Sequence, residues 1–261
     1  MKKTRNNLKD TKYYNSGIEL WKKAEKIIPG GNGLLSKRPQ RYLPDFWPTY
    51  YKRSKKLNIW DLNGKKYTDM AQMGVGTCIL GYSNDEINKK IIKSIKEGNN
   101  STLNSKDEFI LAKKLLKIDK FAEQVKFARG GGEAIDIAIR IARASTKRDN
   151  IIFSGYHGWY DWYLATNLTK KNGLKDHLLP GLDPMGVPKK LKNTVRPLKY
   201  NDIEELIKIK NPKSYDAFIL EPCRFFYPKK RFIKKVNEFC EKNKICLIVD
   251  EITTGFRETL G

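Results

Sequence analysis

The second half of the chain alternates between short apolar runs and segments with helical spacing. Near-continuous apolar runs bounded by turn residues are typical of strands that are buried on both faces. Helical patterns between them favour crossover connections and a parallel sheet. We therefore expect an α/β fold with a mostly parallel sheet covered by helices. The expected strands are residues 125–128, 150–154, 216–221 and 245–251, and the helices start at Glu133 and span 202–210 and 230–244, with an irregular region over 164–198.

The first part of the chain has a different pattern. Residues 15–28 have apolar positions near helical spacing and predict an amphipathic helix, followed by an irregular Pro-rich segment at 38–51. Asn63-Gly64 predicts a two-residue hairpin turn between strands 57–61 and 65–69. We expect an N-terminal segment over 1–75 and a partial large domain over 76–261.

A glycine-spaced run, residues 73–82, then predicts a loop. It is only weakly similar to a dinucleotide-binding fingerprint, because no clear helix follows Gly74 and Gly76. Two helices are expected next, one starting near Ser83 and one over 106–116.

Three glycines, Gly130, Gly131 and Gly132, stand between the expected strand 125–128 and the helix that starts at Glu133. Glycine permits close approach of a ligand to the backbone, and the first N–H groups of a helix have no partner within it. This pattern indicates an anion site, with phosphate as the first hypothesis. A simple tight turn is the alternative.

Polar groups follow three expected strands: Tyr156-His157 after 150–154, Glu221 at the end of 216–221, and Asp250 near the end of 245–251. The carboxyl ends of parallel strands share one edge of a sheet, so these residues should meet near the glycine turn.

Together they suit a flat, phosphorylated heteroaromatic ligand. Tyr156 would stack on the ring, and Asp250 would pair with a protonated ring nitrogen, so that the ring accepts electrons from a carbanion. Each residue has a plainer interpretation: Asp250 as a cap, Glu221 as an exposed strand end, and Tyr156 and His157 as packing groups. Trp159, Trp162 and Tyr163 are interpreted as packing residues.

Composition narrows the class of protein. The chain has 261 residues, of which 39% are hydrophobic, as in globular proteins. We expect a cytoplasmic protein, because no apolar run is long enough for a membrane span and no leader pattern is visible. The cysteines (Cys78, Cys223, Cys240, Cys246) form no C-x-x-C pair and are expected to be buried thiols, and two histidines make a metal site unexpected.

A formal charge of +23 raises the hypothesis of nucleic-acid binding. The lysines are scattered, however, and no arginine-rich recognition helix is present. We therefore regard a basic nucleic-acid-binding protein as the weakest alternative.

Several motifs, in order, resemble the class III aminotransferases of fold type I, which depend on pyridoxal phosphate, and especially the branch of glutamate-1-semialdehyde aminomutase. They are WDLNGKKYTDM (60–70), ILGYSNDEI (79–87), GGEAIDIAIRIAR (131–143), YHGWYD (156–161), LEP (220–222) and DEITTGFR (250–257).

The resemblance implies roles for the matching residues. Gly131 and Gly132 would give backbone N–H groups to the cofactor phosphate, Gly130 lying beside them, and Tyr156 would stack on the pyridine ring. Asp250 would hold the ring nitrogen, His157 would support the pocket, and Glu221 would lie close to the cofactor. Many family members have Ser-Gly-Thr at 130–132, so hydroxyl ligands are lost here.

The resemblance also implies a Schiff-base lysine downstream of DEITTGFR, and no lysine follows Lys244. We expect the N-terminal part of such an enzyme, C-terminally truncated before that lysine. The implied reaction transfers an amino group from a small-molecule donor to a carbonyl acceptor, with a homodimer as the complete form. The alternatives are a 2,1-aminomutase and a catalytically inactive fragment.

Overall fold

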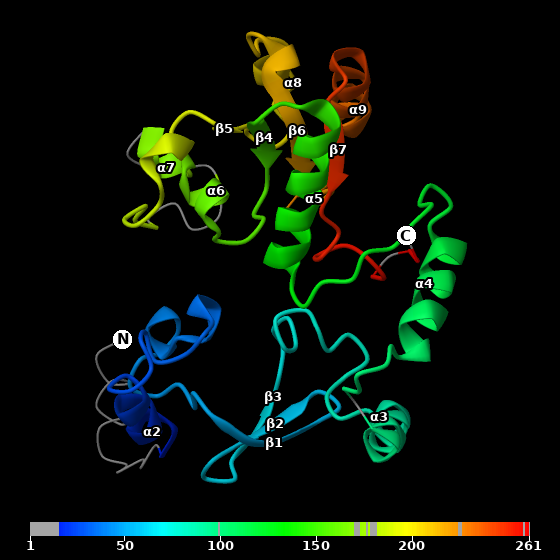
Figure 1. Cartoon of the computed structure of the whole chain (residues 1–261). Helices are drawn as coiled ribbons and strands as arrows, with labels where there is room; N and C mark the ends of the chain where they lie inside the picture. The colour runs from blue at the N-terminus through cyan, green and yellow to red at the C-terminus, as the bar shows by residue number, and fades with distance from the viewer. Residues whose placement is uncertain are drawn as a thin grey trace. The chain divides into compact units, whose positions relative to one another are not determined.

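The structure is a computed structural model that describes residues 16–98, 100–169, 173–175, 177, 182–223, 226–257 and 259–260. The chain divides into two compact units, Met1–Asn104 and Ser105–Gly261, and each is described by itself. Figure 1 gives the labels of the elements along the chain.

The first described element of the first unit is helix α2 (Ser16–Ala24), which is shorter than the predicted 15–28. Trp21 is 3% exposed, and its ring lies where a Cβ on Gly31 would be, 2.4 Å away. Gly31 has a φ of +76°, which glycine adopts readily, so the chain turns back over the tryptophan. The turn leaves Ile27 exposed and ends the helix early.

The Pro-rich segment 38–51, predicted to be irregular, contains one short 3₁₀ turn, η2 (Pro39–Arg41), and another, η1 (Leu35–Lys37), lies just before it. A three-stranded antiparallel sheet follows, in the order β1 (Tyr51–Lys55), β2 (Asn58–Asp61) and β3 (Lys66–Thr68). The sequence analysis missed β1, because its YKRSK sequence has no apolar alternation.

The predicted two-residue turn at Asn63-Gly64 is wrong. Asn58 pairs with Thr68 and Trp60 with Lys66, and residues 62–65 connect the two strands. Asp61 closes this loop, since its Oδ1 accepts a hydrogen bond from the N–H of Lys65 at 2.8 Å. The side chain of Asp61 therefore fixes the longer turn.

The helix predicted near Ser83 is α3 (Asp85–Glu97), and Asn84 caps it by accepting from the N–H groups of Glu86 and Ile87. The next helix, α4 (Lys106–Ile118), belongs to the second unit and has Ser105 as its N-cap. Side-chain caps of this kind are the start signals that predicted both helices.

The second unit contains a four-stranded sheet in the order β5-β4-β6-β7, and all of its pairings are parallel. The strands are β4 (Asn150–Ser154), β5 (Val195–Pro197), β6 (Tyr215–Leu220) and β7 (Cys246–Val249). This arrangement confirms the predicted parallel α/β sheet, for which β4 matches its predicted bounds.

Two predictions about strands are wrong. Residues 125–128 form no strand, since they pair with no neighbouring strand in the described part of the chain. β5 lies in the region 164–198 that was expected to be irregular. Of that region, residues 170–172, 176 and 178–181 lie outside the described residues.

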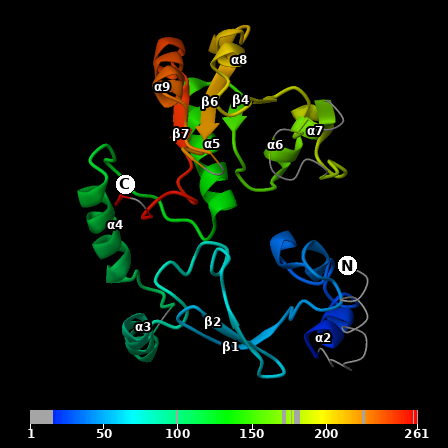
Figure 2. The same cartoon turned by 180° about the vertical axis from the view of Figure 1, so that it is seen from behind.

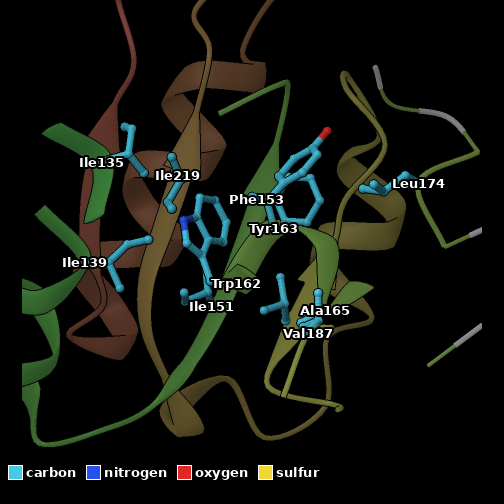
Figure 3. Packing of buried hydrophobic residues seen from close by; sticks show 11 residues of the cluster. Ile135, Ile139, Ile151, Phe153, Trp162, Tyr163, Ala165, Leu174, Val187 and Ile219 are labelled. Atoms are coloured by element: carbon cyan, nitrogen blue, oxygen red, sulfur yellow. The ribbon is translucent and has the colours of Figure 1, made fainter. Parts of the chain in front are cut away.

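Helices cover both faces of this sheet. On one face, α5 (Gly131–Thr146) packs its buried Ile135 and Ile139 against Ile151, Phe153 and Ile219 of the strands (Figure 3). The short helices α6 (Asp161–Leu164) and α7 (Thr166–Thr169) extend this cluster. Figure 2 shows β4, β6 and β7 of this sheet from behind.

On the other face, α8 (Ile203–Ile207) and α9 (Phe232–Asn243) pack against alternate residues of the same strands. Ile152 and Phe218 point to this face, whereas Ile151 and Ile219 point to the other. Burial on both faces explains why these strands are continuous apolar runs. Two 3₁₀ turns, η3 (Lys189–Leu191) and η4 (Pro212–Ser214), lie in the connections.

All four cysteines carry free thiols, but only Cys240 is buried, so the expectation of burial is wrong for the other three. Within the described ranges, no helix combines the length and the apolar character that crossing a membrane requires.

Candidate functional site

The N-terminus of α5 lies at the carboxyl edge of the parallel sheet. Gly130 is the N-cap and Gly131 is the first helical residue, so the helix begins within the glycine turn. Glu133 closes the turn, because its Oε2 accepts a hydrogen bond from the N–H of Arg129 at 2.7 Å. The helix dipole and the free N–H groups of its first turn favour an anion at this end.

Two side chains lie against the glycine turn. A Cβ on Gly131 would be 2.2 Å from Cδ1 of Ile252, and one on Gly132 would be 1.9 Å from Cε2 of Tyr160. Ile252 follows β7, and Tyr160 follows the loop after β4. The turn is therefore in direct contact with the segments after both strands, as the sequence predicts for one shared sheet edge.

The loop after β4 brings His157 to Asp250. The imidazole Nδ1 lies 2.9 Å from Oδ2 of Asp250, and the two residues are 2% and 7% exposed. The other ring nitrogen, Nε2, has no hydrogen-bond partner among the described residues. The ring is stacked on Trp162, with 6.4 Å between the ring centroids.

Asp250 is held at a fixed position after β7. Its N–H donates to the carbonyl of Leu220 at 2.8 Å, and its Oδ1 accepts from the N–H of Ile252 at 3.1 Å. The carboxylate thus makes a turn-type contact, as in the plainer interpretation, and in addition pairs with His157. Both contacts fix the direction of the carboxylate.

Glu221 connects three segments at this edge. Its Oε2 accepts a hydrogen bond from the N–H of Tyr156 at 2.8 Å, and its Oε1 accepts from the hydroxyl of Thr253 at 3.3 Å. It is 2% exposed, so it is not the exposed strand end of the plainer interpretation. This buried carboxylate fixes the loop that carries Tyr156 and His157.

Aromatic side chains surround the loop. Tyr156 is half-buried and lies edge-to-face with Tyr163 at 5.7 Å. Trp162 and Tyr163 are buried in the core, as expected for packing residues. Trp159 stacks on Tyr160 but is 66% exposed, so it lies outside the core of the described unit.

A second tyrosine lies behind Glu221. The hydroxyl of Tyr200 donates to the carbonyl of Pro222, and burial, with smaller contributions from Cys223 and Glu221, raises the pKa of Tyr200 to about 12. This phenol is neutral at physiological pH and buttresses the residue that follows Glu221.

The structure therefore brings the predicted residues Gly131, Gly132, Tyr156, His157, Glu221 and Asp250 to one sheet edge. Nothing lies within 4 Å of a Cβ built on Gly130. Sequence analysis missed the roles of Ile252, Thr253 and Tyr160. Ile252 and Thr253 lie within the DEITTGFR motif, which was the available signal for them.

The fold and this sheet edge define a class of protein. It is an α/β domain in which a helix N-terminus and a buried carboxylate lie at the carboxyl ends of parallel strands. Folds of this class bind phosphorylated ligands at that edge. Residues 43–259 match the family model described as aminotransferase class-III. The chain belongs to the class III aminotransferase family, which comprises pyridoxal-phosphate-dependent aminotransferases and aminomutases.

Similar curated proteins include glutamate-1-semialdehyde 2,1-aminomutase of Wigglesworthia glossinidia brevipalpis, which is 36% identical over 93% of this chain and 56% of the relative. The 3-aminobutyryl-CoA aminotransferase of Cloacimonas acidaminovorans is 29% identical over 94% of this chain and 56% of the relative. The chain thus spans about half the length of these relatives.

Among solved structures, an omega-transaminase from Sphaerobacter thermophilus is similar with a TM-score of 0.78 and 25% identity, covering 93% of this chain and 56% of that one. A glutamate-1-semialdehyde-aminomutase from Pseudomonas aeruginosa PAO1 has a TM-score of 0.72 at 18% identity, covering 92% of this chain and 52% of that one. The fold is therefore fold type I, and the described units correspond to about half of it.

Proposed function

We propose that the edge formed by Gly131, Gly132, Tyr156, His157 and Asp250 binds pyridoxal 5'-phosphate and serves amino-group transfer between an amino donor and a carbonyl acceptor. The observation that carries the proposal is the buried Asp250–His157 pair at 2.9 Å, next to the N-terminus of a 16-residue helix. Family membership supports the same cofactor.

The residues present fit this cofactor. A phosphate needs N–H donors that a ligand can approach closely, and residues 130–132 carry no side chain of their own, so that only Ile252 and Tyr160 lie against Gly131 and Gly132 among the described residues. A pyridinium nitrogen needs a carboxylate in a fixed position, and Asp250 is held by the hydrogen bond from the N–H of Ile252 and by its contact with His157. Both requirements are met within one unit of the fold.

When bound, the cofactor supplies an electron sink that stabilises the carbanion left when the substrate loses its α-proton. Asp250 would keep a positive charge on the ring nitrogen, which strengthens that sink. His157 would orient the Asp250 carboxylate, and Tyr156 would cover one face of the ring. Glu221 would hold the Tyr156 backbone in place through the hydrogen bond at 2.8 Å.

A second candidate function is a 2,1-aminomutase, in which donor and acceptor are one molecule. The relative at 36% identity is named glutamate-1-semialdehyde 2,1-aminomutase, whereas another relative is named an aminotransferase. The two functions differ in stoichiometry. A mutase converts one substrate without a second carbonyl compound, and an aminotransferase requires one.

We further propose that the complete enzyme is a homodimer and that residues 1–75 and 76–261 are its N-terminal segment and the first part of its large domain. The reaction also needs a Schiff-base lysine, which the resemblance places beyond Arg257. Tests of the site are therefore designed around cofactor binding, which these residues would perform themselves.

The test is calorimetric titration with pyridoxamine 5'-phosphate, the aminated form of the cofactor. It has no aldehyde, so it cannot react with the many lysines of a chain that contains 52 Lys and Arg residues. We expect saturable binding at one site that persists at moderate salt and is weakened by Asp250→Asn. Binding that disappears at moderate salt and is indifferent to Asp250 would contradict the proposal and favour non-specific attraction to a basic surface.

A further inference from the structure

The ring of Tyr160 occupies the space that a side chain at position 132 would need. A Cβ on Gly132 would be 1.9 Å from Cε2, 2.7 Å from Cδ2 and 3.0 Å from Cζ of this ring. Real Cβ atoms do not come so close, so only glycine at 132 permits the ring to lie there. Gly158 lies beside this position, since a Cβ built on it would be at ordinary contact distance, 3.5 Å, from the Cα of Gly132.

This position places the ring beside the anion-binding end of α5. Gly132 is the second residue of the helix, and helix side chains lean toward the N-terminus. The space that Tyr160 fills therefore borders the first-turn N–H groups, which have no partner within the helix. The carbon that carries the hydroxyl, Cζ, is one of the three nearest atoms.

The phenol hydroxyl of Tyr160 has no hydrogen-bond partner among the described residues, and the side chain is 43% exposed. Its ring is stacked on Trp159 with 6.3 Å between centroids and an interplanar angle of 20°. The stack limits the ring to a defined orientation next to the helix. The ring of Tyr160, and with it the carbon that carries the hydroxyl, is therefore positioned beside the glycine turn.

We propose that Tyr160 is a phosphate-binding residue of the cofactor site, donating a hydrogen bond from its hydroxyl to a phosphate oxygen at the N-terminus of α5. This inference rests on the proposed function. Gly132 then has two roles, because it exposes the backbone N–H groups and makes room for the ring. The site thereby gains a hydroxyl donor at a turn whose own residues provide none.

The test compares two ligands that differ only in the phosphate, pyridoxamine 5'-phosphate and pyridoxamine, by calorimetry on the wild type and on Tyr160→Phe. Phenylalanine keeps the ring and removes only the hydroxyl. We expect the affinity for pyridoxamine 5'-phosphate to fall about tenfold, the effect of one hydrogen bond to a charged oxygen, with the affinity for pyridoxamine unchanged. Tyr215→Phe, at the opposite end of β6, is the matched control and should change neither affinity.

Equal losses for both ligands, or no loss for either, would overturn the role of Tyr160 while the proposed function stands. If the wild type itself does not prefer pyridoxamine 5'-phosphate to pyridoxamine, the proposed function fails together with the inference.

A second pair of variants tests the link between Tyr160 and Gly132. Gly132→Ala should displace the ring and also weaken pyridoxamine 5'-phosphate about tenfold, because a Cβ at 1.9 Å cannot coexist with it. In the Tyr160→Phe background the same substitution should cost much less, because the hydroxyl is already absent. Additive losses in the double variant would contradict the coupling.

Discussion

The carboxylate of Asp250 and the imidazole of His157 form a buried pair, 2.9 Å apart, that joins the end of β7 to the loop after β4. A buried carboxylate is unfavourable unless it has partners, and this one has the imidazole and the N–H of Ile252. The pair therefore gives the site a carboxyl group of fixed direction, which is what a cationic ring nitrogen requires.

Removing the imidazole of His157 should lower cofactor affinity, because Asp250 loses a hydrogen-bond partner. In His157→Phe a ring remains, but the Asp250 carboxylate loses a partner, at a cost of about 1–3 kcal/mol. We expect a lower melting temperature and a weaker affinity for pyridoxamine 5'-phosphate. Calorimetry and thermal unfolding measure the two effects. An unchanged affinity with a lowered melting temperature would show that His157 is structural only.

We expect Glu221 to affect cofactor affinity by holding the backbone of Tyr156 in place. In the wild type, the two oxygens of Glu221 accept one hydrogen bond each, from the Tyr156 N–H and from the Thr253 hydroxyl. In Glu221→Gln only one oxygen remains, because the amide nitrogen cannot accept, so one of these two hydrogen bonds is lost. We expect partial loss of cofactor affinity, and a larger loss in Glu221→Ala, measured by the same titration. Thr253→Val keeps the Tyr156 contact of Glu221 and removes the hydroxyl that donates to Glu221 and to the Cys223 carbonyl, each at 3.3 Å, so it serves as the milder comparison. If all three variants bind the cofactor with the affinity of the wild type, Glu221 has no such positioning role.

The glycine before Tyr156 provides a test of the loop itself. Gly155 has a φ of +126°, and a Cβ on it would lie 2.6 Å from Oε2 of Glu221. Gly155→Ala should therefore cost both backbone strain of about 1–3 kcal/mol and the Glu221 contact. Gly186 has a φ of +90° with nothing within 4 Å of its Cβ position, so Gly186→Ala isolates the strain. Denaturant unfolding should show a greater loss for Gly155→Ala, and equal losses would contradict the crowding at Glu221.

The stability of the second unit should depend on pH through Asp216. This residue is fully buried at the start of β6, and burial raises its pKa from 3.8 to about 6, although Arg143 opposes the shift. A pKa that is raised on folding contributes stability below about pH 4, and this contribution is lost as the pH rises through about 6. The shift corresponds to about 3 kcal/mol at most.

Asp216→Asn removes this titration. We expect the free energy of unfolding of the variant, relative to the wild type, to increase between about pH 4 and 7 and then to level off. Denaturant unfolding at several pH values measures it, with the exposed Asp45→Asn as the control. A difference that is constant with pH would contradict the raised pKa.

The strands that carry Ile151 and Phe218 could be predicted from the sequence. Both residues lie within continuous apolar runs, and such runs are typical of strands that are buried on both faces. The sequence did not indicate β5, whose three residues include a proline and carry too little pattern. It placed a strand at 125–128, where the pattern is apolar but no partner strand lies among the described residues. A strand is completed by its neighbours, which a local pattern does not contain.

The site residues, like the strands, could be predicted where a local pattern marks them but not where they depend on distant segments. Gly131, His157 and Asp250 could be singled out because they stand at strand ends and helix starts. The contacts of Thr253 with Glu221 and of Tyr160 with Gly132 depend on loops meeting in space. No spacing in the sequence indicates either contact.

The central claim is that Asp250 pairs with the ring nitrogen of a bound pyridine cofactor. It is tested most directly by nitrogen-15 NMR of pyridoxamine 5'-phosphate labelled at that nitrogen and bound to the protein. We predict the chemical shift of a protonated ring in the wild type at neutral pH, and the shift of an unprotonated ring when the ligand is bound to Asp250→Asn. An unprotonated nitrogen in the wild type, or the same shift in both proteins, would contradict the account.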